Sequence, residues 1–283
     1  MPSHPDKKAL LLEALSYIQR FRDKVVVIKY GGAAMIEPEL KESFAQDIVL
    51  LQSLGMRPVI VHGGGPEVSR AMQQMGQEVS FIDGLRVTSA ENLRVAEMVL
   101  SGNINKEIIA QLNRFGGKAV GLSGKDGHLI DAQKKVSPQG ADLGYVGEIM
   151  RTNPELLEVL IGQGFLPVVS PIGMGKDGTT YNINADTAAS RIAVALRAYR
   201  IIFMTDVDGV IKDGSLQSEL SVEQTEQLIR EGVIKGGMAP KVEALLYCVR
   251  NGVQSAQIIN GTDPHSVIAE LFTDEGIGTK IVA

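Results

Sequence analysis

Runs of apolar, mostly β-branched residues alternate along the chain with stretches of helical period. Residues 25–32, Val-Val-Val-Ile-Lys-Tyr-Gly-Gly, open with four β-branched residues, which predicts a strand buried on both faces. Further buried strands are predicted at residues 58–61, 119–123, 166–170, 201–204 and 256–259. Strands that alternate with helices are typical of a mainly parallel sheet covered on both faces. The predicted fold class is therefore α/β, an αβα sandwich with a mainly parallel central sheet.

Helical periodicity occupies the segments between these strands. Helices are expected over residues 38–54, 66–76, 89–113, 154–163, 186–196, 221–230 and 264–272, with another directly after Lys241 and a kink at Ser101-Gly102. Short alternating segments over residues 129–150 predict hairpins beside the sheet. An amphipathic stripe over residues 3–22 predicts an additional N-terminal helix, which packs either on its own domain or on another subunit.

Composition limits the classes of function open to the 283-residue chain. A formal net charge of −5 without blocks of like charge gives no footprint for nucleic acid or an anionic membrane. No stretch approaches the ~18 apolar residues of a membrane span, and the apolar core of a signal peptide is missing. The single cysteine, Cys248, lies in an apolar helical run and is expected to be a packed core thiol. We therefore expect a cytoplasmic protein with no disulfide framework and no Cys/His metal site.

Glycines follow two predicted strands at their carboxyl ends, where open α/β sheets bind ligands. Lys29 and two glycines end the first strand, and His62-Gly63-Gly64-Gly65-Pro66 follow the second and lead into a helix. Unpaired amides and the positive end of the helix dipole predict an anion site there. His62 is either a general base or hydrogen-bonded structure, and a carboxylate acceptor needs no base because it is ionised near neutral pH.

Three polar residues elsewhere are further candidates. Arg86 follows a turn, is expected to be exposed, and has a fork that suits a carboxylate. Asn182 either binds substrate or belongs to a helix start whose N-cap is Asn184. Lys241, five residues after Gly236, is a candidate phosphate ligand. Gly173-x-Gly175-x-x-Gly178 has the letters of a dinucleotide fingerprint but leads into a hairpin-like segment, which excludes that motif.

Five strings occur in order along nearly the whole chain. They are Lys29-Tyr30-Gly31-Gly32, Val61-His62-Gly63-Gly64-Gly65-Pro66, Gly84-Leu85-Arg86-Val87-Thr88, Asn182-Ile183-Asn184-Ala185-Asp186 and Gly237-Met238-Ala239-Pro240-Lys241. Together they resemble the amino acid kinase family, and within it the members that act on N-acetyl-L-glutamate. The resemblance implies transfer of the γ-phosphoryl group of ATP to the side-chain carboxylate of N-acetyl-L-glutamate, the second step of arginine biosynthesis. It also implies Mg²⁺ held mainly by the ATP phosphates, with few or no direct protein ligands.

The resemblance implies roles residue by residue. Lys29 and Lys241 would flank the transferred phosphoryl group, and Asp186 would orient both lysines. Substrate contacts are implied for Gly64, Gly65, Arg86 and Asn182, and nucleotide contacts for Gly31, Gly32, Thr205, Asp206, Gly209, Val210, Gly237 and Met238. Residues 23–194 would form the acyl-acceptor lobe and residues 195–283 the ATP lobe.

Residues 15–21 look like the extra helix of arginine-inhibited family members. This resemblance implies feedback inhibition by L-arginine and dimers interlaced into a homohexamer, a trimer of dimers. The implied arginine site includes Tyr17, Glu270, Gly276 and Gly278. Some relatives also bind a PII-type regulator, and the sequence leaves that partner open. Two alternatives remain: a sister kinase acting on aspartate, glutamate, carbamate or UMP, and a non-catalytic arginine or nucleotide sensor.

Overall fold

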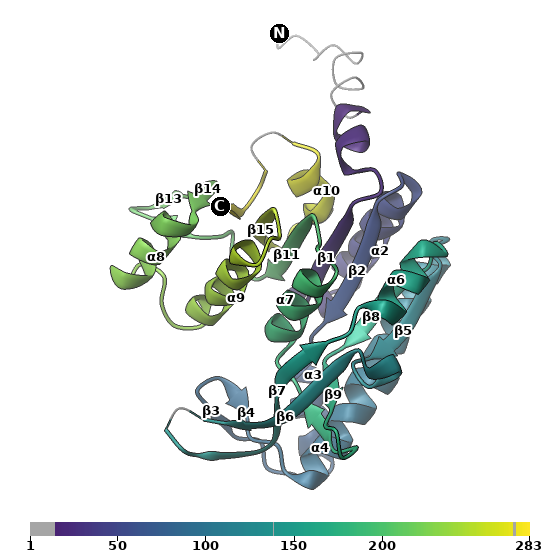
Figure 1. Ribbon diagram of the computed structural model, residues 1–283, viewed down its shortest axis with the longest axis vertical. Coiled ribbons are helices and arrows are strands. Elements are labelled where there is room, and N and C mark those ends of the chain that lie inside the picture. The colour runs from purple at the N-terminus through teal and green to yellow at the C-terminus, as the bar shows by residue number, and fades with distance from the viewer. Residues whose placement is uncertain (1–14, 138, 274–275) are drawn as a thin grey trace.

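An eight-stranded sheet runs through the middle of the molecule (Figure 1). The computed structural model describes residues 15–137, 139–273 and 276–283. The strands, in spatial order, are β14 (Glu219–Ser221), β16 (Thr279–Val282), β15 (Ser255–Asn260), β11 (Arg200–Thr205), β1 (Val25–Tyr30), β2 (Arg57–His62), β8 (Leu166–Ser170) and β5 (Ala119–Ser123). Neighbours are parallel except β15 and β16, so the predicted mainly parallel sheet is confirmed. The chain end, expected only as an apolar tail, forms β16.

Strand β1 lies between β11 and β2, so segments from both predicted lobes share one sheet. Val27 points into the core on one face, whereas Val26 and Ile28 point into the core on the other. This double burial is what the run of β-branched residues predicts. It fixes Lys29 at the carboxyl end of a strand held on both sides.

Helices cover both faces of the sheet. One face packs against α6 (Glu155–Gly162), α7 (Ala185–Ala195), α8 (Val222–Arg230) and α9 (Met238–Arg250). The other packs against α2 (Pro38–Ser53), α3 (Gly65–Gln74), α4 (Ala90–Glu97), α5 (Asn105–Arg114) and α10 (Ser266–Leu271). The αβα sandwich is therefore confirmed. Helix α9 was expected to begin after Lys241 but begins before it. Pro240 is tolerated in its first turn because the N–H groups there have no intrahelical acceptor to lose.

The helix predicted over residues 89–113 is continuous but irregular. Between α4 and α5 the segment Met98–Ile104 is a π-helix, at the place where Ser101-Gly102 predicted a kink. Shorter 3₁₀ turns occur at Gly32–Met35 and Asp126–His128. Leu100 of this π-helix lines the cavity at the carboxyl ends of β1 and β2.

A small closed barrel stands beside the sheet and confirms the predicted hairpins. It consists of β10 (Thr180–Asn182), β7 (Asp142–Thr152), β6 (Ile130–Val136) and β9 (Ile172–Met174). Gly173, Gly175 and Gly178 lie in the β9–β10 hairpin. This agrees with the prediction that they do not form a dinucleotide-binding loop. Two hairpins are separate from both sheets, namely β3 (Phe81–Ile82) with β4 (Leu85–Arg86) and β12 (Ile211–Lys212) with β13 (Ser215–Leu216).

Residues 15–21 are helical, and the remaining residues expected in the N-terminal helix lie mostly outside the described ranges. Phe21 is fully buried against its own chain, with its ring 5.6 Å from Tyr199 and 6.4 Å from Phe272. Cys248 is buried as expected, and burial raises the pKa of its thiol to about 12. Within the described residues, no helix combines the length and apolar character that a membrane crossing needs.

Candidate active site

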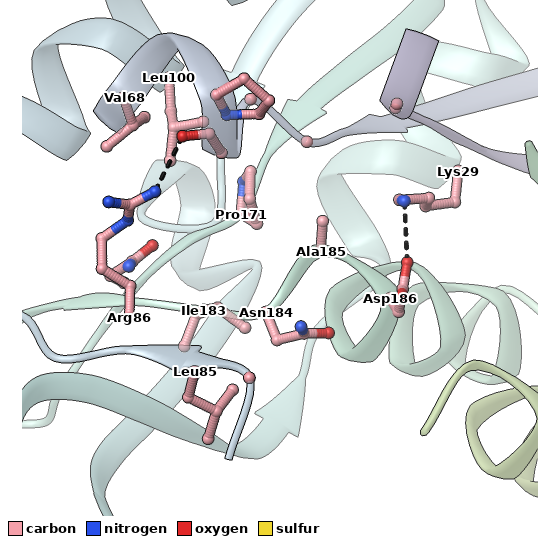
Figure 2. Close-up of a pocket in the computed structure, with 18 of the residues that line it drawn as sticks. Lys29, Val68, Leu85, Arg86, Leu100, Pro171, Ile183, Asn184, Ala185 and Asp186 are labelled. Carbon is pink, nitrogen blue, oxygen red and sulfur yellow. Dashed lines mark hydrogen bonds and ion pairs between the residues drawn. The ribbon is translucent and has the colours of Figure 1, made fainter. Parts of the chain in front are cut away.

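A cavity of about 280 Å³ opens at the carboxyl ends of β1 and β2 (Figure 2). The residues predicted for the catalytic and substrate-binding site all line it, together with two of the predicted nucleotide contacts: Lys29, Gly31, Gly32, Gly64, Gly65, Arg86, Asn182, Asp186 and Lys241. Other lining residues, among them Glu67, Leu100 and Pro171, were not predicted. Figure 2 shows Arg86 at one side of this cavity and the Lys29–Asp186 pair at the other. The cavity therefore has an anion-binding group at each side.

One carboxylate joins the two lysines. The Lys29 ammonium lies 3.0 Å from Asp186 Oδ1, and the Lys241 ammonium donates a 2.9 Å hydrogen bond to Asp186 Oδ2. Asp186 stands in the first turn of α7, whose N-cap is Asn184 as predicted; the Asn184 side chain accepts a hydrogen bond from the Thr187 amide. Each ammonium has three donors, so each keeps donors available for a ligand.

The electrostatics of this trio keep Asp186 ionised. Burial by itself would raise the pKa of Asp186, but the charges of Lys29 and Lys241 outweigh it and hold the pKa below its usual value. Two cations against one carboxylate leave a net positive charge in a largely buried place. Such a place attracts phosphate or carboxylate.

Glycine is required at two positions of the cavity wall. A Cβ at Gly31 would lie 2.9 Å from the Lys29 ammonium nitrogen, and Gly31 thus keeps room for that ammonium. Gly64 has φ +152°, and a Cβ there would come within 2.3 Å of Ile104 Cδ1 and 2.9 Å of Leu100 Cδ2. Both contacts come from the π-helix, so the glycine loop is packed directly against it.

Arg86 is buried, with 8% of its surface exposed, so the expectation of an exposed arginine was wrong. The β3–β4 hairpin turns its guanidinium inward, where Nη2 donates to the Gly65 carbonyl at 2.8 Å and to Ser69 Oγ at 2.7 Å. The Phe81 ring lies 4.8 Å from the guanidinium carbon. Burial lowers the pKa of Arg86, although arginine stays charged at any ordinary pH. Asn182 lines the same cavity from β10, with Nδ2 3.4 Å from Thr88 Oγ1.

A second hollow of about 470 Å³ lies beside the loop after β11. It is lined by Asp206, Gly209, Val210 and Met238 of the predicted nucleotide contacts, and also by Lys235 and Asn260. Asn260 donates a 2.8 Å hydrogen bond to Asp208 and so braces the loop. Thr205 is buried and donates to the Val207 carbonyl, and neither it nor Gly237 lines this hollow.

A third hollow of about 310 Å³ contains Tyr17, Glu270 and Gly276. Glu270 is buried, and its Oε2 accepts the N–H groups of Ile277 at 2.8 Å and Gly278 at 3.2 Å. Gly278 thus supports Glu270 rather than lining the hollow. Burial raises the pKa of Glu270 despite these bonds.

Sequence reasoning missed several residues of these sites. Ser69 and Asn105 carry no motif signal. Arg20 lies in the helix that resembles arginine-inhibited members but was not named as a site residue, and Arg200, Gln257 and Lys280 lie in or beside segments predicted only as apolar. A periodicity argument sorts residues into core and surface, so it overlooks a buried polar side chain on a core strand.

A comparison with protein-family models matches residues 24–260 to the one described as "Amino acid kinase family". The chain belongs to the amino acid kinase family. Among its relatives in that family, proteins named acetylglutamate kinase from Moorella thermoacetica and Methanocaldococcus jannaschii are 50% and 51% identical to it, each over 98% of this chain. The matches cover 97% and 96% of those relatives. These comparisons agree with the resemblance carried by the five strings.

A solved structure of N-acetylglutamate synthase from Neisseria gonorrhoeae, complexed with coenzyme A and N-acetyl-glutamate, is also similar. It has a TM-score of 0.87 and 28% identity over 99% of this chain, which spans 64% of that longer protein. A complex of the same synthase with coenzyme A and L-arginine has a TM-score of 0.85 and 26% identity over 98% of this chain, which spans 66% of that protein.

Proposed function

We propose that the protein phosphorylates the side-chain carboxylate of N-acetyl-L-glutamate with MgATP, giving N-acetyl-L-glutamyl 5-phosphate in arginine biosynthesis. A carboxylate oxygen forms a bond to the γ-phosphorus while the bond from that phosphorus to the bridging oxygen breaks, and ADP leaves. No proton is moved, because the acceptor carboxylate is ionised at neutral pH. The observation that carries the proposal is the pair of lysines bound to the two oxygens of Asp186.

The lysines act as charge stabilisers. The transferred phosphoryl group spreads negative charge over its equatorial oxygens, so positioning and charge stabilisation supply most of the catalysis. Asp186 holds Lys29 and Lys241 at fixed directions, and their remaining donors face the phosphoryl group. Prior fixing of these charges limits the reorganisation needed during the reaction.

The acceptor is bound from two sides. Arg86 pairs with its α-carboxylate, because a planar fork suits that group. Asn182 meets the N-acetyl amide, and the amides of Gly64 and Gly65 donate to the reacting carboxylate. Free aspartate and glutamate lack the N-acetyl amide that Asn182 would meet, and carbamate and UMP lack the α-carboxylate that Arg86 would pair with.

ATP extends from the glycines of the first cavity into the second hollow. Gly31, Gly32 and the N-terminus of α9 donate to its phosphates, and Gly209 and Met238 line the space for the rest of the nucleotide. Both oxygens of Asp186 are occupied by lysines, which fits Mg²⁺ held mainly by the ATP phosphates. When bound, Mg²⁺ neutralises phosphate charge.

An acyl-phosphate assay with hydroxylamine trapping tests the proposal. The wild-type protein is expected to give ATP-dependent hydroxamate with N-acetyl-L-glutamate and much less with glutamate, aspartate or carbamate. Lys29→Ala and Lys241→Ala should each reduce turnover by on the order of 10²-fold with the fold intact. A preference for free glutamate, or near-normal rates in both variants, would refute the assignment; ligand binding without any turnover would support the sensor alternative.

We also propose that L-arginine binds the third hollow and inhibits the enzyme. Among the described residues, the buried atoms Arg200 Nε and Gln257 Oε1 have no hydrogen-bond partner, and both residues line this hollow. An unsatisfied buried polar atom costs about 1–3 kcal/mol, so a ligand with both donors and acceptors gains by binding there. L-arginine supplies a carboxylate for Arg200 and donors for Gln257 and Glu270.

Arginine titration of the acyl-phosphate assay tests this second proposal. Glu270→Gln is expected to weaken inhibition at least about tenfold, since a charge-assisted hydrogen bond is lost. Removal of residues 1–22 should abolish inhibition and leave turnover. The exposed variant Glu231→Gln is the control. Unchanged inhibition in the truncated protein would contradict the proposal. We also propose that the N-terminal helix links the subunits of a homohexamer. Sedimentation of the full-length and the truncated protein tests that assembly.

A further inference from the structure

His62 is a buried titratable group for which the proposed chemistry has no use. It ends β2, directly before the glycine loop, and has no exposed surface. Burial lowers its pKa to about 4, so the imidazole is neutral at physiological pH. A neutral ring with no solvent access is a poor candidate for a general base, and its two nitrogens instead contact fixed groups.

The contacts of the ring allow one tautomer. Nδ1 lies 2.8 Å from the Gly63 carbonyl oxygen, which can only accept, so Nδ1 carries the hydrogen. Nε2 lies 3.2 Å from Asn105 Nδ2 and accepts from it. The Asn105 amide is itself oriented, because its Nδ2 also donates to the Val168 carbonyl at 3.0 Å.

These contacts fix the peptide plane between Gly63 and Gly64. In a trans peptide the C=O and N–H point in opposite directions. The Gly63 carbonyl is turned into the buried ring, so the Gly64 N–H points away from that ring, and Gly64 itself lines the cavity. The loop is tied on the other side as well, since the Gly63 N–H donates to the Tyr30 carbonyl at 2.8 Å. For the Gly64 N–H, no acceptor is found in the part of the chain that the structure describes.

The π-helix supplies the support on the far side. Leu100 and Ile104 pack against Gly64, and Asn105 follows at the first turn of α5. A π-helical turn is a rare irregularity that is frequent at functional sites. Here it places Leu100 and Ile104 against the glycine loop, directly before Asn105, whose side-chain amide contacts His62.

We infer that His62 is a positioning residue for phosphoryl transfer: held by Asn105, its Nδ1–H fixes the Gly63–Gly64 peptide so that the Gly64 N–H points at the reacting carboxylate. This inference rests on the proposed function for the identity of the acceptor. Rotation of the peptide would turn a carbonyl oxygen toward the incoming anion, replacing an attraction with a repulsion.

Two substitutions separate this role from simple packing. The Nδ2 of Asn is the same number of bonds from Cα as His Nδ1, so His62→Asn keeps a donor for the Gly63 carbonyl. His62→Gln places its amide where Nε2 was, so it keeps the contact with Asn105 and loses the one with Gly63. We expect His62→Gln to lower kcat/KM for N-acetyl-L-glutamate by on the order of 10²-fold, the cost of losing one such donor, with KM for ATP nearly unchanged.

His62→Asn should retain at least about ten times the kcat/KM of His62→Gln. Equal losses in the two variants at equal thermal stability, or wild-type kinetics in His62→Gln, would overturn the inference. Nuclear magnetic resonance of the wild-type protein labelled with ¹⁵N-histidine keeps the test decisive if a variant fails to fold. The neutral Nδ1–H tautomer of His62 at pH 7 supports the inference, and the Nε2–H tautomer or an imidazolium overturns it, whichever acceptor the enzyme uses. Wild-type protein inactive toward N-acetyl-L-glutamate would instead refute the proposed function.

Discussion

The Lys29 ammonium and the Asp186 carboxylate form a 3.0 Å ion pair across the crevice. Lys29 belongs to the central strand and Asp186 to the first turn of α7, so the pair joins the sheet to one of its covering helices. Since Lys241 occupies the other oxygen, the single carboxylate separates two like charges that would otherwise repel each other.

Asp186→Asn should therefore reduce turnover far more than it reduces substrate binding. The amide keeps the shape of the carboxylate but cannot hold two ammonium groups by charge, so the lysines lose their fixed directions. We expect kcat to fall by on the order of 10²-fold, as for loss of a preorganised electrostatic group. Steady-state kinetics measure this, with the exposed Asp263→Asn as control. A kcat within threefold of the wild type would show that the lysines need no such partner.

Much of the fold and of this site is predictable because it depends on local pattern. The β-branched runs give the strands, and polar residues and glycines at strand ends give the crevice, since parallel strands bring their carboxyl ends together. Arg86 was predicted as a ligand but not as buried, because its burial depends on a hairpin that folds over it.

The contact between His62 and Asn105 was beyond sequence reasoning for a different reason. The two residues are far apart in the chain, and Ser101-Gly102 predicts only a kink, not the π-helix that aligns Asn105. Long-range polar contacts of this kind are set by tertiary packing. Motif spacing does not carry them.

Gly31→Ala should disable the enzyme without unfolding it. Gly31 does not have a positive φ, so alanine fits the backbone, but its Cβ would lie 2.9 Å from the Lys29 ammonium nitrogen. That nitrogen ends a flexible side chain and can move, which breaks its ion pair with Asp186. We expect at least a tenfold drop in kcat, comparable to partial loss of one stabilising charge, and a change in unfolding free energy below about 1 kcal/mol.

The matched control for this substitution is Gly162→Ala, at the end of α6, where a Cβ meets nothing within 4 Å. Urea unfolding and steady-state kinetics of both variants make the comparison. Normal kcat in Gly31→Ala would mean that the position of the Lys29 ammonium is not critical.

Arg86→Lys should raise KM for the acceptor selectively. The Nη2 of Arg86 bonds both the Gly65 carbonyl and Ser69 Oγ, and a lysine ammonium cannot reproduce this fork together with a paired carboxylate. The expected increase in KM for N-acetyl-L-glutamate is about tenfold to 100-fold, the cost of a charge-assisted pair, with KM for ATP unchanged. The exposed Arg94→Lys serves as control. A parallel rise in KM for N-acetyl-L-glutamate and KM for ATP would mean that Arg86 stabilises the fold in general instead of binding the acceptor.

His62 should make the stability of the wild-type protein depend on pH. Its pKa is lowered to about 4 in the folded protein by burial, against about 6.5 in the unfolded chain. Between these values the unfolded chain binds a proton that the folded protein does not, so stability falls as pH falls from 6.5 toward 4. The loss from this group between pH 7 and pH 5 is about 2 kcal/mol. Urea unfolding at both pH values should show that loss for the wild type and a loss smaller by this amount for His62→Asn, which has no ionisable group there. Equal losses in the two proteins would mean that His62 takes up a proton in the folded state as readily as in the unfolded one, contrary to its burial and to its contact with Asn105.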